Sequence, residues 1–221
     1  MRFSAKVIEN RETEDVHVRT LVLQPETPNF TFLPGQWVSI RQPLAEKEVV
    51  RAYSMLEPDR LVLCLDAVEN GLLSPYLCSI SPGTVLQVAG PYGNFVLPDP
   101  LPKHLLFVAR YTGIVPIYCM LRHLQGLMNP PQITLIYSLP SGAPLFVQEL
   151  TAWQQSWPQF RLELIEKGPQ HREQEVLTRI LRQEPHVFPM IAGINDFVKP
   201  VRTLLAEFGY KRGQYAFEKF G

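Results

Sequence analysis

The sequence predicts two domains, an N-terminal antiparallel β-barrel and a C-terminal Rossmann-like α/β domain with a parallel sheet. Three observations support this fold. Short β-rich segments fill the chain up to residue 98, and strands alternate with helices after residue 103. Between them lies PDPLPK, whose prolines are typical of a rigid connector. We therefore expect a barrel domain over residues 1–98 and an α/β domain over residues 103–221.

The barrel is predicted from short segments rich in branched and aromatic residues. They read VHVRTLVLQP, QWVSIRQP, VVRAYSML, RLVLCLDAV and TVLQVAG. Tight turns are expected at Pro34-Gly35 and Pro82-Gly83, because proline followed by glycine suits the two central positions of a turn. Strands this short, separated by turns, favour an antiparallel barrel or sandwich.

The second half of the chain contains four strand–helix units. The expected strands are HLLFVA, QITLIYSL, FRLELIEK and VFPMIAGI, and the helices that follow them are IVPIYCMLRHLQGLM, LFVQELTAWQQSW, EQEVLTRILRQ and DFVKPVRTLLAEF. In the last helix Asn195 is the predicted N-cap and Gly209 the stop, while Pro116 and Pro200 are expected near the first turns of their helices. Four such units predict a doubly wound parallel sheet.

Composition limits the function classes. The 221 residues carry no formal net charge and no long basic run, so nothing indicates a nucleic-acid partner. The longest apolar runs are too short to span a membrane, and the first residues show no export signal, so we expect a cytoplasmic protein. The three widely spaced cysteines cannot form a four-cysteine metal or iron–sulfur site, so no metal is expected and the cysteines are interpreted as buried apolar residues.

Three short motifs in the barrel half have the chemistry of a flavin site. RAYS, residues 51–54, combines a guanidinium for phosphate, an aromatic ring for stacking and a hydroxyl for a ring heteroatom. GLLS, residues 71–74, is a glycine turn that opens a short helix, where free backbone N–H groups suit a second phosphate. GPYGNF, residues 90–95, follows at the end of the barrel. Taken alone, Arg51 also fits an ordinary surface arginine and Tyr53 a barrel core residue.

The α/β half opens with VARYTGIVP, residues 108–116, at a strand-to-helix turn where such domains bind a nucleotide phosphate. These turns usually carry glycines, because backbone amides must approach the ligand closely and some residues need positive φ. Here Gly113 is present, but Arg110 and Tyr111 stand where small residues are expected. The turn is therefore a working dinucleotide site, an altered one, or a turn that has lost its ligand.

These motifs resemble, in order and spacing over nearly the whole chain, those of the ferredoxin–NADP reductase superfamily. The family has R-x-Y-[ST], G-x-x-S and G-P-[YF]-G-x-F in its flavin barrel, and G-G-T-G-[IV]-[AT]-P followed later by C-G-P in its nucleotide half. The chain departs from this pattern twice. Arg110-Tyr111 replaces the glycine pair, and Ala192-Gly193-Ile194 replaces C-G-P, so that the cysteine usually beside the nicotinamide is missing.

The resemblance implies a role for each matching residue. Arg51 would bind the flavin pyrophosphate, Tyr53 would stack on the isoalloxazine and Ser54 would bond near its N5. In catalysis Ser54 would act together with Glu218, which the ending FEKFG would place near the flavin with Phe220. The other expected cofactor-binding residues are Ala52, Gly71, Leu72, Leu73 and Ser74 for the flavin, and Arg110, Thr112 and Gly113 for the nicotinamide nucleotide.

The resemblance implies an FAD-dependent reductase that takes electrons from NADH or NADPH and passes them through flavin to a separate acceptor, such as a ferredoxin-like protein, an oxygenase component or a small molecule. FAD is expected rather than FMN. One alternative is a flavin-binding electron-transfer or regulatory subunit that has lost pyridine-nucleotide turnover, and another is a non-flavin binding module. The segment YSLPSG, residues 137–142, offers hydroxyls at the expected adenosine ribose but neither the acid typical of an NADH site nor the arginine typical of an NADPH site.

Overall fold

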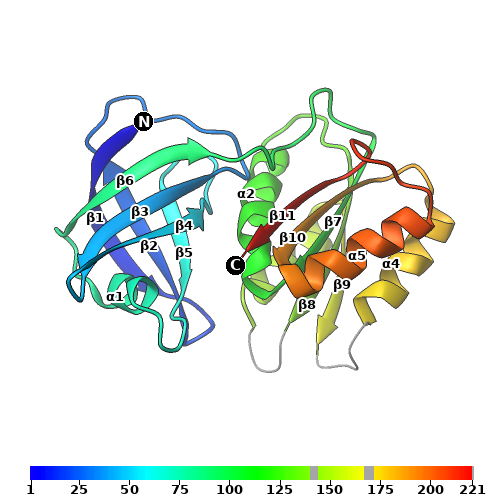
Figure 1. Ribbon diagram of the computed structural model, residues 1–221. Coiled ribbons are helices and arrows are strands. Elements are labelled where there is room, and N and C mark those ends of the chain that lie inside the picture. The colour runs from blue at the N-terminus through cyan, green and yellow to red at the C-terminus, as the bar shows by residue number, and fades with distance from the viewer. Residues whose placement is uncertain (140–143, 167–171, 221) are drawn as a thin grey trace. The chain divides into compact units, whose positions relative to one another are not determined.

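The computed structural model describes residues 1–139, 144–166 and 172–220, which form two compact units. The barrel unit comprises Met1–Val96 together with Tyr118–His123, and the α/β unit comprises Leu97–Ile117 together with Leu124–Gly221. Figure 1 shows antiparallel strands in the first and a parallel sheet with helices in the second. The predicted two-domain fold class is confirmed.

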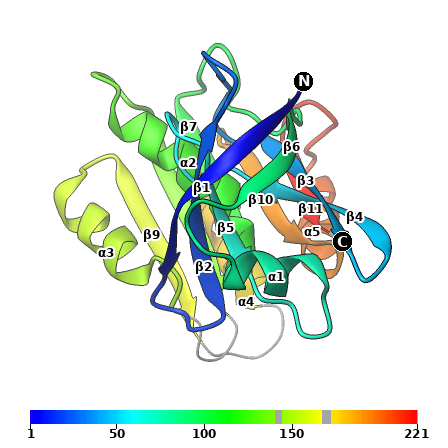
Figure 2. The ribbon, with the colours of Figure 1, turned by 90° about the vertical axis from the view of Figure 1, so that its left-hand side faces the viewer.

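The barrel unit contains one six-stranded antiparallel sheet in the order β4-β3-β6-β1-β2-β5. Its elements are β1 (Arg2–Glu12), β2 (Val18–Pro25), β3 (Trp37–Leu44), β4 (Lys47–Ser54), β5 (Val62–Asp66), α1 (Leu73–Ser79) and β6 (Val85–Tyr92). A bridge between Met55 and Leu63 joins the two outer strands, so the sheet curls into a barrel (Figure 2).

Strand β1 was not among the predicted strands, although its sequence alternates as a strand should. Phe3, Ala5 and Val7 point into the barrel core, and the residues between them face outward. β1 pairs with β2 on one side and with β6 on the other. The pattern was hard to read because a small alanine and many charged residues weaken the apolar signal.

Helix α1 is fixed to β1 by the side chain of Asn10. Its Nδ2 lies 3.1, 3.2 and 2.9 Å from the carbonyl oxygens of Leu77, Cys78 and Ile80. These carbonyls belong to the last turn of the helix and the residue after it, where no intrahelical donor is available. Asn10 thus holds the helix that the GLLS motif opens.

The α/β unit is built on a five-stranded parallel sheet in the order β11-β10-β7-β8-β9. Its elements are β7 (His104–Arg110), the 3₁₀ turn η1 (Tyr111–Gly113), β8 (Gln132–Leu139), α3 (Val147–Ser156), β9 (Phe160–Glu166), α4 (Arg172–Gln183), β10 (Phe188–Ile194), α5 (Asn195–Glu207) and β11 (Ala216–Phe220). Helix α2 (Ile114–Gln125) follows η1, and its residues Tyr118–His123 group with the barrel unit. Helices α4 and α5 lie side by side on one face of the sheet, where they cover a core that includes Leu106, Val108 and Ile191 (Figure 1).

The last helix differs slightly from the prediction. Helix α5 begins at Asn195, and Ile194 is its N-cap, with no side-chain cap. Gly209 does follow the helix as expected, with a φ of +84°. Pro116 lies in the first turn of α2, but Pro200 is the sixth residue of α5 and therefore lies in its second turn. The final strand β11 was not predicted as a strand.

The strand order places a topological switch between β7 and β10. From β7 the chain moves outward through β8 and β9, then returns to the other side of β7 for β10 and β11. In open parallel sheets, ligands bind at the carboxyl ends of the strands at such a switch. The turn that follows β7 is therefore at the position where a ligand is expected.

At this switch point the turn after β7 packs directly on β10. A Cβ added to Gly113 would come within 2.2 Å of the Ala192 carbonyl oxygen and 2.9 Å of the Gly193 Cα. Only glycine fits this approach. Tyr111, in contrast, has a φ of +47°, which is the left-handed conformation that glycine adopts at lowest cost.

We predict opposite sensitivities at these two positions. Gly113→Ala should cost about 1–3 kcal/mol or prevent folding, because the new methyl group meets backbone rather than a movable side chain. Tyr111→Gly should leave stability within about 1 kcal/mol, since relief of the left-handed tyrosine is offset by the entropy of an unfolded glycine. Urea unfolding of both variants measures the difference. A Gly113→Ala variant as stable as the parent would contradict the close approach.

Candidate functional site

The RAYS motif forms the end of β4. Arg51 and Tyr53 alternate with Ala52 and Ser54, so the first pair faces one side of the sheet and the second pair the other. Arg51 is exposed, and its guanidinium donates to the carbonyl of its neighbour Val50 at 2.8 Å. In the part of the chain that the structure describes, Arg51 has no carboxylate partner, so its charge is available to an anion.

Tyr53 lies half-buried against the barrel core, with part of its ring exposed. Burial raises the pKa of Tyr53 to about 12, while the nearby Arg51 charge acts in the opposite direction and Cys78 adds a smaller rise. Its hydroxyl therefore stays protonated at neutral pH and can donate a hydrogen bond. Ser54 is the last residue of β4 and lies opposite Trp37, so a flat ring contacting both Tyr53 and Ser54 would have to lie across the strand end.

The GLLS motif forms the turn before α1. Gly71 donates its N–H to the Val68 carbonyl at 2.9 Å, and the Ser74 hydroxyl accepts the Val68 N–H at 3.2 Å. Ser74 is thus buried in the turn itself rather than directed outward. Leu72 is exposed, Leu73 is buried, and the helix start has no side-chain cap. The backbone N–H groups of this first turn are consequently the donors that the motif can offer a phosphate.

The GPYGNF motif comprises the last residues of β6 and the three residues that follow the strand. Gly93 has a φ of +102°, and a Cβ there would lie 2.8 Å from the Trp37 ring. That ring packs against Tyr92 with centroids 4.9 Å apart. Phe95 is buried, with 2% of its surface exposed. The motif therefore packs around Trp37, which is the strand neighbour of Ser54.

In the α/β unit, the turn Arg110–Gly113 is connected to β8 by two side chains. Tyr137 is fully buried, and its hydroxyl lies 3.3 Å from the Tyr111 carbonyl and 3.2 Å from the Leu145 carbonyl. Both carbonyls can accept its proton, so Tyr137 fixes the turn to the segment before α3. The amides at the start of η1 have no intrahelical acceptor, as at any helix start.

The second connection passes through a buried carboxylate. Glu173, in the first turn of α4, is 7% exposed and accepts a hydrogen bond from the Ser138 hydroxyl at 2.5 Å. The same oxygen, Oε1, lies 3.7 Å from Arg110 Nη1. Arg110 itself is exposed. A carboxylate this far from water requires such partners, and the pair therefore holds the Arg110 guanidinium beside the turn.

The end of the sheet on the β10 side carries the remaining predicted residues. Ala192 on β10, the position of the missing cysteine, is fully buried and lies in register with Glu218 on β11. Burial raises the pKa of Glu218. Phe220 is the register partner of Ile194, and both lie at the carboxyl ends of their strands. Glu218 and Phe220 face the same side of the sheet.

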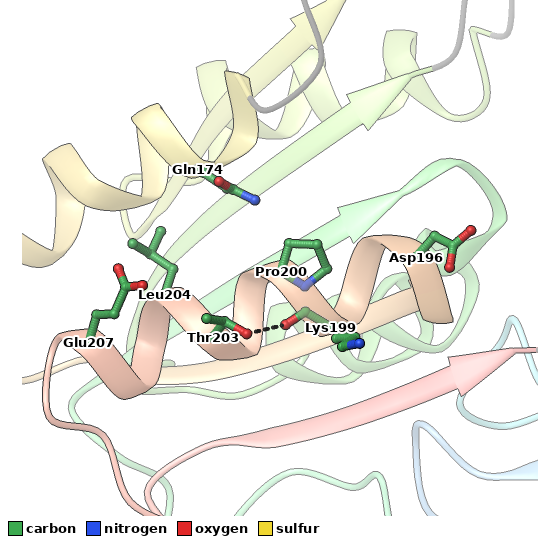
Figure 3. A pocket seen from close by; sticks show the side chains of 7 residues that line it. All are labelled: Gln174, Asp196, Lys199, Pro200, Thr203, Leu204 and Glu207. Atoms are coloured by element: carbon green, nitrogen blue, oxygen red, sulfur yellow. Dashed lines mark hydrogen bonds between the residues drawn. The ribbon is translucent and has the colours of Figure 1, made fainter.

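A shallow groove of about 480 Å³ runs along α5 and the start of α4, separate from these residues. Figure 3 shows the side chains around it, among them Asp196, Lys199 and Glu207. The predicted site residues do not line it. Its charged groups are exposed, so the groove has the character of an ordinary cleft between two helices.

The structure thus brings the predicted residues together in two groups. In the barrel unit, Arg51 and Tyr53 share one face of β4. In the α/β unit, Arg110, Thr112 and Gly113 form the turn at the switch point. Sequence reasoning missed Glu173 and Tyr137 as neighbours of that turn. Glu173 lies far from it along the chain and belongs to no motif, whereas Tyr137 was quoted only as part of YSLPSG, of which residues 140–142 lie outside the described residues.

Among the described residues, no helix is long and apolar enough to cross a membrane. Within the same residues, no three His, Cys, Asp or Glu side chains gather as a metal site requires.

Residues 5–97 match the family described as Oxidoreductase FAD-binding domain. An NADPH oxidoreductase of Mycobacterium tuberculosis (strain ATCC 25618 / H37Rv) is 35% identical over 185 residues, which cover 79% of this chain and 48% of that protein. Ferredoxin--NADP reductase B of Sorangium cellulosum (strain So ce56) is 43% identical over 97 residues, which cover 42% of this chain and 40% of that protein. The chain therefore spans about half the length, or less, of these curated relatives.

The fold also resembles a solved structure, that of the CS-b5R domains of human Ncb5or in the NAD⁺ form. The TM-score is 0.85 at 16% identity, over 98% of this chain and 69% of that chain. At this identity the likeness concerns the fold alone. The match of residues 5–97, the motif order along the barrel and the curated relatives support the assignment of the chain to the ferredoxin–NADP reductase superfamily.

Proposed function

We propose that the protein is an FAD-dependent reductase that takes electrons from NADH or NADPH and delivers them to a separate acceptor. The observation that carries the proposal is the match of residues 5–97 to an FAD-binding domain of oxidoreductases. The barrel and the α/β unit correspond in this proposal to an FAD-binding domain over residues 1–98 and a nucleotide-binding domain over residues 103–221.

The barrel residues fit an FAD molecule in their chemistry. Arg51 offers an exposed guanidinium without a carboxylate partner in the described residues, which suits a pyrophosphate. Tyr53 offers a partly exposed ring whose hydroxyl keeps its proton. Gly71, Leu72, Leu73 and Ser74 open α1, and the backbone amides there are the donors for a second phosphate group. Ser54, the last residue of β4, would meet the flavin across the end of the strand, whereas Ala52 would contribute through its backbone.

In the α/β unit, Thr112 and Gly113 would bind the dinucleotide phosphates through their amides. We propose that the turn is altered but still binds nucleotide, since Tyr111 already has the left-handed backbone that a glycine would supply. Arg110 would add a cation at the edge of the turn. When bound, FAD accepts a hydride from the nicotinamide and releases electrons to the next carrier.

Ser54 and Glu218 are the proposed catalytic residues. A hydroxyl at the end of β4 would donate to the flavin atom that gains the hydride. Glu218, with its raised pKa, keeps a proton to higher pH than an ordinary glutamate and could hold it near the reacting rings. Phe220 would cover the flavin from the end of β11.

The acceptor is proposed to be a separate protein such as a ferredoxin-like carrier or an oxygenase component, or a small molecule. The sequence has three widely spaced cysteines, fewer than the four that an iron–sulfur site requires, so a one-electron carrier would be a separate protein. A cytoplasmic location remains our prediction.

An anaerobic titration tests the proposal. The purified chain, reconstituted with FAD, should be yellow, because oxidised flavins absorb at about 450 nm. This absorbance should be lost when NADH or NADPH is added and reduces the flavin. Retained colour with both nucleotides would favour the alternative of an electron-transfer or regulatory subunit without nucleotide turnover. Failure to bind FAD would favour a non-flavin binding module.

We predict that Arg51→Ala weakens FAD binding while the fold stays intact. A charge-assisted hydrogen bond contributes about 1.5–3 kcal/mol, which corresponds to roughly 10–150-fold in the dissociation constant of FAD. Fluorescence titration with FAD measures this dissociation constant. Arg41→Ala is the matched control, because Arg41 is a strand arginine of the same sheet paired with Glu48. Equal FAD affinity in both variants would remove Arg51 from the site.

Ser54→Ala should slow flavin reduction more than it weakens FAD binding. A hydroxyl near the atom that gains the hydride matters most in the transition state, where one hydrogen bond supplies about tenfold in rate. Anaerobic stopped-flow reduction at saturating nucleotide gives the rate, and Ser39→Ala on β3 serves as the control. If the Ser54 variant is reduced as fast as the parent, Ser54 has no catalytic role.

Glu218→Gln should stabilise the protein at neutral pH but not at acidic pH. Burial raises the pKa of Glu218 in the folded state, so the folded protein holds the proton more tightly than the unfolded chain. The stability of the parent is then highest at low pH and falls as pH rises through the unfolded and folded pKa values. A glutamine at this position does not titrate, so the variant avoids that loss of stability. Thermal unfolding at about pH 4, near the ordinary pKa of a glutamate, and at about pH 8, well above it, compares the parent with the variant. A gain that does not depend on pH would contradict this sign.

A further inference from the structure

The end of β8 carries a carboxylate that belongs to a distant part of the sequence. Glu173 comes from α4, yet its Oε1 lies 2.5 Å from the hydroxyl of Ser138, the second-to-last residue of β8. It is 7% exposed, and the ion pair with Arg110 at 3.7 Å reaches the end of β7. The carboxylate therefore joins the ends of two neighbouring strands at the carboxyl edge of the sheet.

The position of this carboxylate has a meaning in a dinucleotide-binding sheet. β7 is the first strand of the sheet and β8 the second, and in such sheets the adenosine ribose lies over the end of the second strand. An acid there accepts a hydrogen bond from the ribose 2′-hydroxyl and disfavours a 2′-phosphate. The described residues at the end of β8, Tyr137, Ser138 and Leu139, include no acid, and α4 supplies one.

The direction of the hydrogen bond at the end of β8 also favours a ribose 2′-hydroxyl over a 2′-phosphate. The Ser138 proton is donated to Glu173, so the serine oxygen has only lone pairs left to offer. Lone pairs accept from a hydroxyl but repel a phosphate. Arg110 lies 3.7 Å from this carboxylate, so a 2′-phosphate that approached the Arg110 guanidinium would also approach the negative charge of Glu173.

We propose that Glu173 is the specificity-determining residue of the dinucleotide site and makes it prefer NADH over NADPH. The inference rests on the proposed function, because it presumes that the turn after β7 binds a dinucleotide. Family membership leaves the choice open, since one relative is named for NADPH and the structural neighbour is an NAD⁺ form.

The test compares ADP-ribose with its 2′-phosphate by isothermal calorimetry on the FAD-loaded full chain. These ligands differ only at the ribose 2′ position, so effects on the shared pyrophosphate cancel in the ratio of their dissociation constants. The parent should bind ADP-ribose at least about tenfold more tightly than its 2′-phosphate, because the 2′-phosphate would be brought close to the negative charge of Glu173.

Glu173→Gln keeps the shape and the acceptor for Ser138 but removes the charge, so the ratio should shift toward the 2′-phosphate by about tenfold. Glu175→Gln is the matched control, because Glu175 lies in the same first turn of α4 but is exposed, and its ratio should equal that of the parent. Ser138→Ala, which keeps the carboxylate, should retain the preference for ADP-ribose.

A thermal melt of each variant establishes that it is folded. A parent that binds both ligands equally or prefers the 2′-phosphate overturns the proposal, as does an unchanged ratio in a folded Glu173→Gln variant. If Glu173→Gln does not fold, loss of the ADP-ribose preference in Ser138→Ala overturns it. Failure of the parent to bind either ligand is a different result, because it overturns the proposed function and this inference with it.

Discussion

The contact on which the α/β unit depends is the close approach of the turn after β7 to the backbone of β10. Gly113 lies so near the Ala192 carbonyl that no side chain fits between them, and this contact joins the two strands at which the sheet order reverses. The loops after these strands must share one edge of the sheet, which is where a ligand can meet both. The positions of Arg110, Thr112 and Glu218 all follow from strands that end at this edge.

In this turn, side chains replace the glycine pair of the ferredoxin–NADP reductase motif. Tyr111 itself has the left-handed backbone conformation, the buried Tyr137 hydroxyl binds its carbonyl, and Glu173 forms an ion pair with Arg110. Several partners hold this turn together, and a non-glycine residue in the left-handed conformation is found mostly at functional sites. The absence of the glycine pair therefore agrees with a nucleotide site that is altered in detail and retained in outline, as we propose.

Sequence alone predicted the two-part fold and the strand–helix order of the second half, because periodicity and turn residues report local structure. It missed β1, whose alternation is weakened by Ala5 and many charges, and β11, which is a short strand at the chain end. It also missed Glu173, since a contact between residues far apart in sequence leaves no local pattern. Arg51 and Tyr53 could be proposed from the sequence because their motif is contiguous on β4, but the burial of Ser74 within its own turn could not be predicted.

The central claim is that the turn Tyr111–Gly113 binds the phosphates of a dinucleotide. The most direct test follows backbone amide resonances by NMR while ADP-ribose is added to the full chain loaded with FAD. The account predicts saturable shifts of the Thr112 and Gly113 amides, together with residues at the end of β10, because these groups lie at the switch point of the sheet. Shifts confined to other surfaces, or none in this turn at saturating ligand, would contradict it.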